Sequence, residues 1–219
     1  MGIKDDVNSC LSRMRNIGGT GKGTYGEDAA LKVCEQLYQD QGGILIKSYT
    51  YKTEDNLPGN IKKGANGELY FENLGGYTEI DVLLITPYRI FPIEVKAYKA
   101  STIHLEDKGI SGVNIKNKSP VHQNEMHCRH LYPKLFSVIP DGLTKYIVPI
   151  VVFVDKCTLV DERSDWQKAY VPATILNNLR ALIDYYNKPS EFRLDLDAID
   201  RYLLKAQLSA EKKFPVRKM

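Results

Sequence analysis

The sequence predicts a single α/β domain in which helices flank a mixed central β-sheet. Segments with the two-residue period of strands alternate with segments of helical period, and this alternation favours the α/β class. Residues 146–154, YIVPIVVFV, are almost wholly apolar, as expected of a strand covered on both faces. The chain of 219 residues is 43% hydrophobic, which is enough for one domain with a full core. We expect a sheet of about four or five strands.

The N-terminal segment predicts a helical extension over residues 1–17, ahead of a main domain over 18–219 that includes the C-terminal helices. Val7, Leu11 and Met14 recur at helical spacing within it. The glycine-rich stretch GGTGKGTYG (18–26) does not meet the phosphate-loop pattern, because no Gly lies four residues before the Gly-Lys pair and Gly23 follows it. We interpret this stretch as an entry to the next helix.

The next helix is predicted over residues 26–41 and ends at Gly42–Gly43. Its apolar face consists of Ala30, Leu31, Val33, Cys34, Leu37 and Tyr38. The same periodicities predict, in chain order, a strand over 44–51, a polar loop over 52–67, a strand over 68–74, a two-stranded hairpin over 78–98, short strands or a loop over 99–119, a helix with Ser119 as N-cap and Pro120 at its first position, the strand over 146–154, and helices over 172–187 and 195–212.

Composition restricts the class of protein. The four cysteines form no CxxC pair, so we expect free thiols in a reducing compartment and no disulfide framework. The N-terminus lacks the apolar core of a signal peptide, and no stretch approaches the roughly 18 apolar residues of a membrane helix. We therefore expect a soluble, intracellular, cytoplasmic protein with no membrane partner. A net charge of +3 permits nucleic acid as a partner without demonstrating it.

The hairpin TEIDVLLITPYRIFPIEVKAY (78–98) carries charge within two apolar strands, at Asp81, Glu94 and Lys96. Burial of such ions costs several kcal/mol each unless something compensates. If the turn is centred on Pro87–Tyr88, residues whose numbers sum to 175 face each other, so Asp81 lies opposite Glu94. A divalent cation would convert the repulsion of the two carboxylates into shared ligation. Lys96 shares the face of Glu94.

The alternative is a partly buried ion pair between Lys96 and either Glu94 or Asp81, retained for structural specificity. Pro92 could shift the register, because a proline removes a donor from the ladder. In the register that sums to 175, Glu79 lies opposite Lys96, which predicts a cross-strand salt bridge.

Three segments, GTYGEDAALKVCEQL, TEIDVLLITPYRIFPIEVKAYKA and SPVHQNEMHCRHL, resemble the nuclease-related domain (NERD) family of the PD-(D/E)xK nuclease superfamily. The resemblance extends from about Gly23 to the strand over 146–154. It implies a restriction-endonuclease-like fold and metal-dependent hydrolysis of phosphodiester bonds in DNA, most simply by an endonuclease. The implied cofactor is Mg²⁺ or Mn²⁺, as one or two ions. DNA repair, mobile elements and phage defence are all compatible contexts.

The resemblance also implies roles for single residues. Asp81 and Glu94 would bind the metal, with the carbonyl of Val95 as a further ligand. Lys96 would orient the attacking water and stabilise charge that develops on the phosphorane. Such a sparse set of ligands suits Mg²⁺, which is held by one or two carboxylates and keeps several waters.

Two further positions match the family pattern. Glu27 would hold a second metal or reach the first through water, whereas the alternative is an acid that merely complements the helix dipole. Gln123, in the Pro-x-x-Gln element that starts at Pro120, would contact the scissile strand or steady Lys96, whereas the alternative is an exposed helix residue. His122, His127, Cys128 and His130 predict no zinc site, because only His127 and His130 share a face.

The expected partner is DNA, with RNA left open, and a homodimer or a partner protein is compatible with the sequence. Tyr25, Tyr49 and Tyr51 could stack on bases beside basic loops. The candidate backbone contacts are Lys22, Lys52, Lys62, Lys63, Lys108, Lys116 and Lys118. The alternative functions are an inactive nuclease-fold subunit that binds nucleic acid or serves as a scaffold, and a structural protein whose charged hairpin is an ion-pair network.

Overall fold

The computed structural model describes residues 14–16, 24–52, 61–63, 69–71, 77–107, 109–113, 119–139, 145–190 and 192–211. Its elements in chain order are β1 Met14–Asn16, α2 Thr24–Gln41, β2 Ile44–Lys52, β3 Ile61–Lys63, β4 Leu69–Phe71, β5 Tyr77–Ile85, β6 Ile90–Lys96, β7 Thr102–Glu106, β8 Gly109–Ser111, α3 Pro120–Leu135, β9 Ile150–Phe153, β10 Thr158–Asp161, α4 Asp165–Tyr170, β11 Ala173–Ile175, the 3₁₀ helix η2 Leu176–Asn178, α5 Leu179–Tyr186 and α6 Leu196–Glu211.

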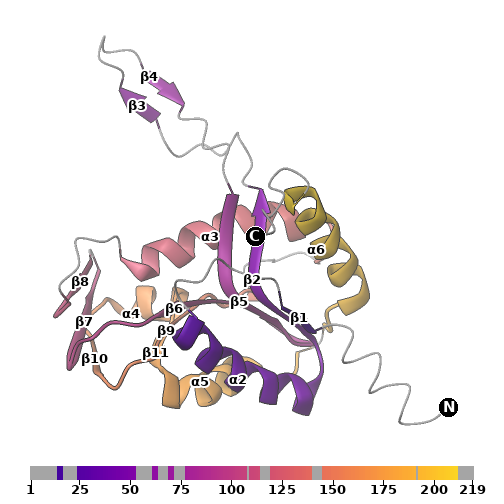
Figure 1. The fold of residues 1–219 in the computed structure, drawn as a ribbon. Helices are drawn as coiled ribbons and strands as arrows, with labels where there is room; N and C mark the ends of the chain where they lie inside the picture. Colours follow the sequence, from indigo (N-terminus) through magenta and orange to yellow (C-terminus); the bar gives the residue numbers. More distant parts are fainter. Residues whose placement is uncertain are drawn as a thin grey trace, which may run out of the picture.

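A mixed six-stranded sheet forms the centre, in the order β1-β2-β5-β6-β9-β11 (Figure 1). The pairs β2–β5 and β5–β6 are antiparallel, and the remaining neighbours are parallel. The predicted fold class, a mixed sheet flanked by helices, is therefore confirmed. Two smaller sheets accompany it, β10-β7-β8 and the pair β3–β4.

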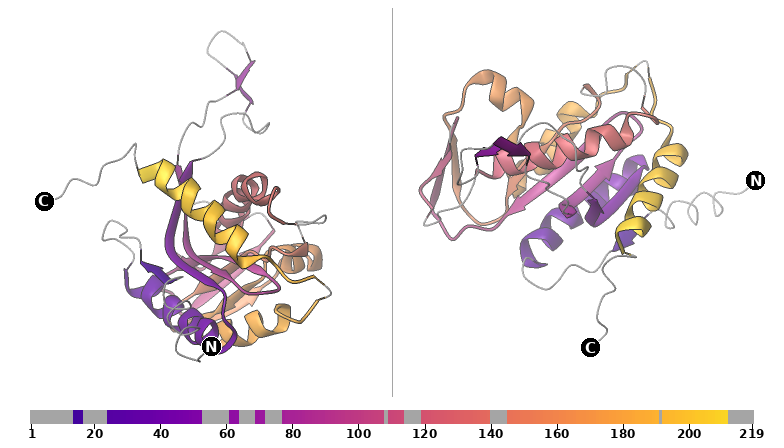
Figure 2. Two further views of the ribbon diagram at one scale, coloured as in Figure 1. Left: turned by 90° about the vertical axis from the view of Figure 1, so that its right-hand side faces the viewer. Right: turned by 90° about the horizontal axis from the view of Figure 1, so that it is seen from above.

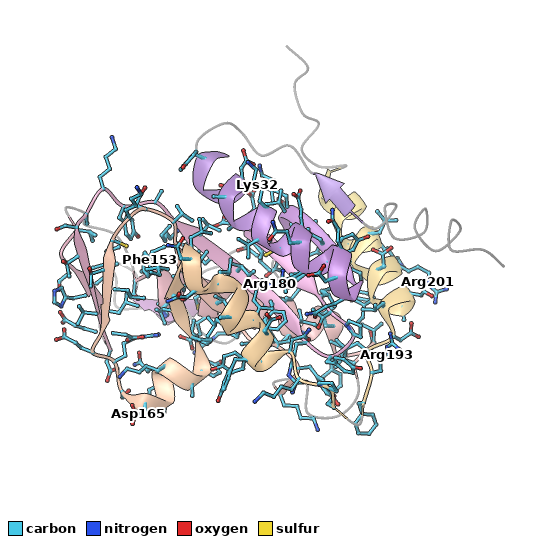
Figure 3. The ribbon with its side chains drawn as sticks, turned by 90° about the horizontal axis from the view of Figure 1, so that it is seen from below. Lys32, Phe153, Asp165, Arg180, Arg193 and Arg201 are labelled. Atoms are coloured by element: carbon cyan, nitrogen blue, oxygen red, sulfur yellow. The ribbon has the colours of Figure 1, made fainter. Side chains whose placement is uncertain are left out.

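Helices cover both faces of the central sheet. On one face α2 and α5 pack against alternate apolar side chains of β5, β6 and β9, and on the other face α3 and α6 pack mainly against those of β2 and β5 (Figure 2). Figure 3 shows α2 and α5 side by side, and Arg180 of α5 pairs with Asp40 of α2 at 2.7 Å. The second side of β9 is covered separately, because Val151 and Phe153 pack against Ile103 and Leu105 of β7, and burial on both sides explains the unbroken apolar sequence of β9.

Several sequence predictions need correction. The sheet has six strands because the short β1 and β11 join its edges. Residues 14–16 form β1, although they were predicted as helix; the rest of that predicted helix and the glycine-rich residues 18–23 lie outside the described residues. Residues 173–175 form β11, so the predicted helix over 172–187 begins only with η2 and α5. β3 lies within the predicted loop 52–67.

Other elements agree with their predictions, although the strand predicted over 146–154 is shorter and forms only β9, Ile150–Phe153. The helix over 26–41, the strand over 44–51, the hairpin strands and the helix from Pro120 are confirmed to within a few residues. The described cysteines Cys34, Cys128 and Cys157 are free thiols, and Cys10 lies outside the described residues.

The hairpin has the predicted register. Val82 pairs with Ile93 and Ile85 with Ile90, so the residue numbers sum to 175, and the Thr86 N–H donates to the Arg89 carbonyl across the turn at 2.9 Å. The proline in β6 therefore does not shift the register.

Pro92 is tolerated because it falls in a gap of the pairing between β6 and the segment that leads into β9. A single bridge joins Ile90 to Ile147, and the continuous ladder starts only at Ile93–Ile150. The fully buried side-chain amide of Asn124 on α3 fills the gap, donating to the carbonyls of Pro92 at 3.1 Å and Ile150 at 2.8 Å. Asn124 thus fixes α3 against both strands.

We expect Asn124→Leu to destabilise the fold by about 2–4 kcal/mol, because it leaves two buried carbonyls without a donor. Urea unfolding followed by circular dichroism measures this loss. Asn177→Leu, at an exposed position of η2, is the matched control and should stay within about 0.5 kcal/mol of the wild type. Equal stability of the two variants would contradict the role given to Asn124.

Candidate active site at the fork of β5 and β6

The two hairpin strands part where the charged residues begin. Their ladder ends at Val82–Ile93, yet β5 continues beside β2 and β6 continues beside β9. Because hydrogen-bonded pairs alternate along an antiparallel ladder, the Val95 N–H would meet the Ile80 carbonyl if the ladder continued. It donates instead to Oδ2 of Asp81 at 2.7 Å. Asp81 therefore stands at the fork and bridges the two strands.

The strand on the other side of Asp81 is distorted as well. Ser48 is the residue that falls opposite Asp81 in β2, between two paired neighbours, and it has a φ of +52°. Ile46 and Tyr49 consequently face the same core although they are three residues apart. A buried non-glycine residue with positive φ stores strain, and such strain concentrates at functional sites.

Glu94 lies on the α3 face of β6 and is 1% exposed. Its Oε1 accepts a hydrogen bond from Nζ of Lys96, and its Oε2 lies 3.3 Å from Nδ1 of His127. The sequence left open whether Lys96 pairs with Glu94 or with Asp81, and the structure shows the pair with Glu94. No described residue donates a hydrogen bond of acceptable geometry to Oε2, so this buried carboxylate oxygen is only partly satisfied.

The predicted salt bridge between Glu79 and Lys96 is wrong. The β5–β6 ladder ends at Val82, before the strands reach these residues. Glu79 is exposed and accepts a hydrogen bond from Oγ1 of Thr50 at 3.3 Å.

Glu27 approaches the site from the first turn of α2. That turn is pressed against the sheet at Gly26, where an added Cβ would lie 2.8 Å from Cγ2 of Val154. Burial raises the pKa of Glu27, the positive charge of Lys47 opposes the rise, and nearby carboxylates that include Glu94 add to it. Glu27 therefore lies within the electrostatic field of the acidic pair.

The two central carboxylates repel each other. Burial, followed by the charge of Glu94, raises the pKa of Asp81 to about 7, although the Val95 N–H and Lys96 pull it down. Burial alone would lower the pKa of Lys96, but the ion pair with Glu94 outweighs it and the net pKa is raised, so the ammonium stays charged. One ammonium thus lies near two acids, the buried Glu94 and the partly buried Asp81.

The residues at the fork fit a hard divalent cation. They offer two carboxylates in mutual repulsion, and the buried Oε2 of Glu94 has only the 3.3 Å contact with Nδ1 of His127, which falls short of hydrogen-bond geometry. Within the described part of the chain, no three His, Cys, Asp or Glu side chains gather around one point, so Glu27 does not complete a three-ligand cluster with Asp81 and Glu94. Mg²⁺ requires no such cluster, because it commonly keeps several waters.

The helix α3 contributes two further residues. Gln123 is half-buried in the first turn, and His127 lies one turn later and contacts Glu94. The sequence reasoning missed His127 because it tested the histidines only as a zinc cluster. Its spacing of four residues from Gln123 places both on one helix face, and this signal could have identified it.

The predicted stacking role of two tyrosines is wrong. Tyr49 and Tyr51 are 0% exposed and stack on each other at 5.2 Å, because the distortion at Ser48 turns both towards the core. Tyr25, by contrast, is 79% exposed at the start of α2. Of the candidate lysines, Lys22, Lys108, Lys116 and Lys118 lie outside the described residues, and only the backbone is described for Lys52, Lys62 and Lys63.

A forked mixed sheet with two acids and a lysine at the fork defines a nuclease-like α/β protein. The nuclease-related domain (NERD) model matches residues 22–154, and the chain belongs to this family. The match confirms the resemblance, and it relates the function of the chain to nucleases. Searches among curated proteins and among solved structures return no match. None of the helices in the described ranges combines the length and apolar character of a membrane span.

Proposed function

We propose that the chain is a metal-dependent nuclease that hydrolyses phosphodiester bonds of DNA, most simply as an endonuclease. The observation that carries the proposal is the pair of Asp81 and the buried Glu94 at the strand fork, whose mutual repulsion keeps the pKa of Asp81 raised although Lys96 lies beside them. Keeping two acids together at this point has a stability cost that a bound divalent cation would offset.

In this proposal Asp81 and Glu94 hold Mg²⁺, or Mn²⁺ in its place, together with the carbonyl of Val95. The bound ion supplies a water of lowered pKa and a positive charge beside the phosphate. Lys96 directs its ammonium at the attacking water and at the developing negative charge. Glu27 would hold a second ion or reach the first through water, and Gln123 would contact the scissile strand or steady Lys96.

A second candidate is a nuclease-fold subunit that binds nucleic acid without turnover. The observation that favours it is the direct ion pair between Lys96 and Glu94, because the lysine already neutralises one of the acids. In that case the fork would be a structural network, and a divalent ion would change neither stability nor activity.

Incubation of the purified chain with circular single-stranded DNA and with plasmid DNA, in Mg²⁺, Mn²⁺ or EDTA, tests the proposal. We expect conversion to linear or shorter products only with the metals. Lys96→Gln should slow cleavage at least about 100-fold, because it removes the charge that handles the water and the phosphate. Lys99→Gln, at an exposed position just beyond β6, is the matched control and should cleave normally.

DNA cleavage that proceeds equally well in EDTA would contradict the proposal. If neither DNA is cleaved but labelled DNA still binds in an anisotropy titration, the binding subunit is the correct function. If Lys96→Gln cleaves as fast as Lys99→Gln, the active site lies elsewhere.

A further inference from the structure

His127 and Glu94 face each other in the interior between α3 and β6. The atoms Nδ1 of His127 and Oε2 of Glu94 lie 3.3 Å apart, and the two side chains are 12% and 1% exposed. Both atoms are buried, and neither has a hydrogen bond of good geometry to any described residue. We propose that His127 is a positioning residue that donates its ring N–H to Glu94 and orients this carboxylate for the metal. The inference rests on the proposed function and concerns the same site.

Buried hydrogen bonds fix the backbone of the helix turn that carries His127. The hydroxyl of Tyr51 donates to the carbonyl of His127 at 2.5 Å, and Tyr51 is itself buried in the stack with Tyr49. One turn earlier, Asn124 ties α3 to the carbonyls of β6 and β9. The helix turn that carries His127 therefore cannot slide along β6 without breaking buried hydrogen bonds.

The two donors to Glu94 have different properties. Lys96 brings a positive charge to Oε1, and this charge competes with any cation that approaches the acids. A neutral imidazole with its proton on Nδ1 can donate to Oε2 without adding charge. His127 can therefore fix the plane of the carboxylate and leave the other lone pairs to the metal, as outer partners of ligating carboxylates commonly do.

Two substitutions separate hydrogen bonding from packing. The side-chain nitrogen of Asn occupies nearly the place of Nδ1, so His127→Asn retains a donor, whereas His127→Leu fills similar space without one. Isothermal titration with Mg²⁺ in the absence of DNA, repeated with Mn²⁺ by electron paramagnetic resonance, measures the effect on the metal site directly. The Mg²⁺ concentration for half-maximal cleavage provides the second readout.

We expect His127→Leu to weaken Mg²⁺ binding by about 10–100-fold, the usual effect of losing an outer partner of a ligand. His127→Asn should restore most of the affinity. His122→Leu, at an exposed position on the same helix, should bind Mg²⁺ like the wild type. Thermal unfolding of each variant confirms that the comparison is made between folded proteins.

Two results would overturn the inference: wild-type affinity in His127→Leu, or equally weak binding in the Leu and Asn variants, which would assign the residue to packing alone. A wild-type chain that binds Mg²⁺ but cleaves no DNA overturns the proposed nuclease and leaves the His127 comparison decisive for the metal site. A wild-type chain that binds neither Mg²⁺ nor Mn²⁺ overturns both.

Discussion

Asp81→Asn is expected to abolish Mg²⁺-dependent DNA cleavage while the fold stays at least as stable as the wild type in EDTA. The amide oxygen of Asn can still accept the hydrogen bond from the Val95 N–H that closes the fork. The substitution removes the repulsion with Glu94 and, with it, a ligand of the metal. Loss of an outer partner already costs 10–100-fold, so loss of a ligand should slow cleavage by more than about 100-fold.

The measurement combines a plasmid-nicking rate with thermal unfolding in EDTA and in Mg²⁺. Mg²⁺ should raise the melting temperature of the wild type and not that of Asp81→Asn. Asp28→Asn, which changes an exposed acid in the same first turn as Glu27, is the matched control and should keep both the cleavage and the Mg²⁺ effect.

The structural alternative makes the opposite prediction. If Asp81, Glu94 and Lys96 serve only as an ion-pair network, Mg²⁺ should not change the melting temperature, and Glu94→Ala should destabilise the fold by leaving Lys96 without its partner. In the nuclease, the fold tolerates Glu94→Ala in EDTA or gains from the loss of repulsion. A destabilised Glu94→Ala with no Mg²⁺ effect in the wild type would reject the enzyme.

The register of the central hairpin could be predicted because the position of the turn and the alternation of the strands require the same pairing. The turn at Pro87–Tyr88 and the alternation of the strands both require the register in which residue numbers sum to 175, and the structure has it. The register also survives Pro92, because the pair Leu83–Pro92 falls between hydrogen-bonded pairs and the missing N–H faces β9 rather than β5. On the β9 side the carbonyl of Pro92 accepts a hydrogen bond from Asn124, 32 residues later, which no local rule contains. The pairing of the two hairpin strands was therefore predictable, whereas the hydrogen bond from Asn124 to the carbonyl of Pro92 was not.

The fork itself could not be predicted. The register alone extends the ladder to Asp81–Glu94 and Glu79–Lys96, but β5 follows β2 and β6 follows β9 beyond Val82–Ile93. The choice depends on competition between neighbouring strands, which sequence periodicity does not express. The same competition explains why the predicted salt bridge of Glu79 fails.

The errors at Tyr49 and Tyr51 have a local cause. A regular strand in which Ile44 and Ile46 face α6 would turn both tyrosines to the opposite face. The positive φ of Ser48 shifts the alternation by one residue, and serine carries no signal for such a conformation. The short edge strands β1 and β11 were missed because three residues are too few to show a period.

Without metal, the contribution of Asp81 to stability should be lost as the pH rises from about 4 to about 7. Burial and the charge of Glu94 raise the pKa of Asp81 from 3.8 to about 7. Between these two values the folded state keeps the proton on Asp81 and the unfolded state releases it, so each increase in pH favours unfolding. The contribution of Asp81 to stability is full below about pH 4 and is lost once the pH passes about 7. The loss is on the order of a few kcal/mol.

The difference between the wild type and Asp81→Asn isolates this effect, because the other carboxylates titrate in both proteins. Urea unfolding in EDTA at pH values from 4.5 to 8 should show similar stabilities at the acidic end and a more stable Asp81→Asn at the alkaline end. Mg²⁺ added at pH 8 should remove that advantage by stabilising the wild type alone, since only an ionised Asp81 can bind it. A constant difference across the whole pH range would show that Asp81 keeps an ordinary pKa, and the acids at the fork would then have no repulsion for a metal to relieve.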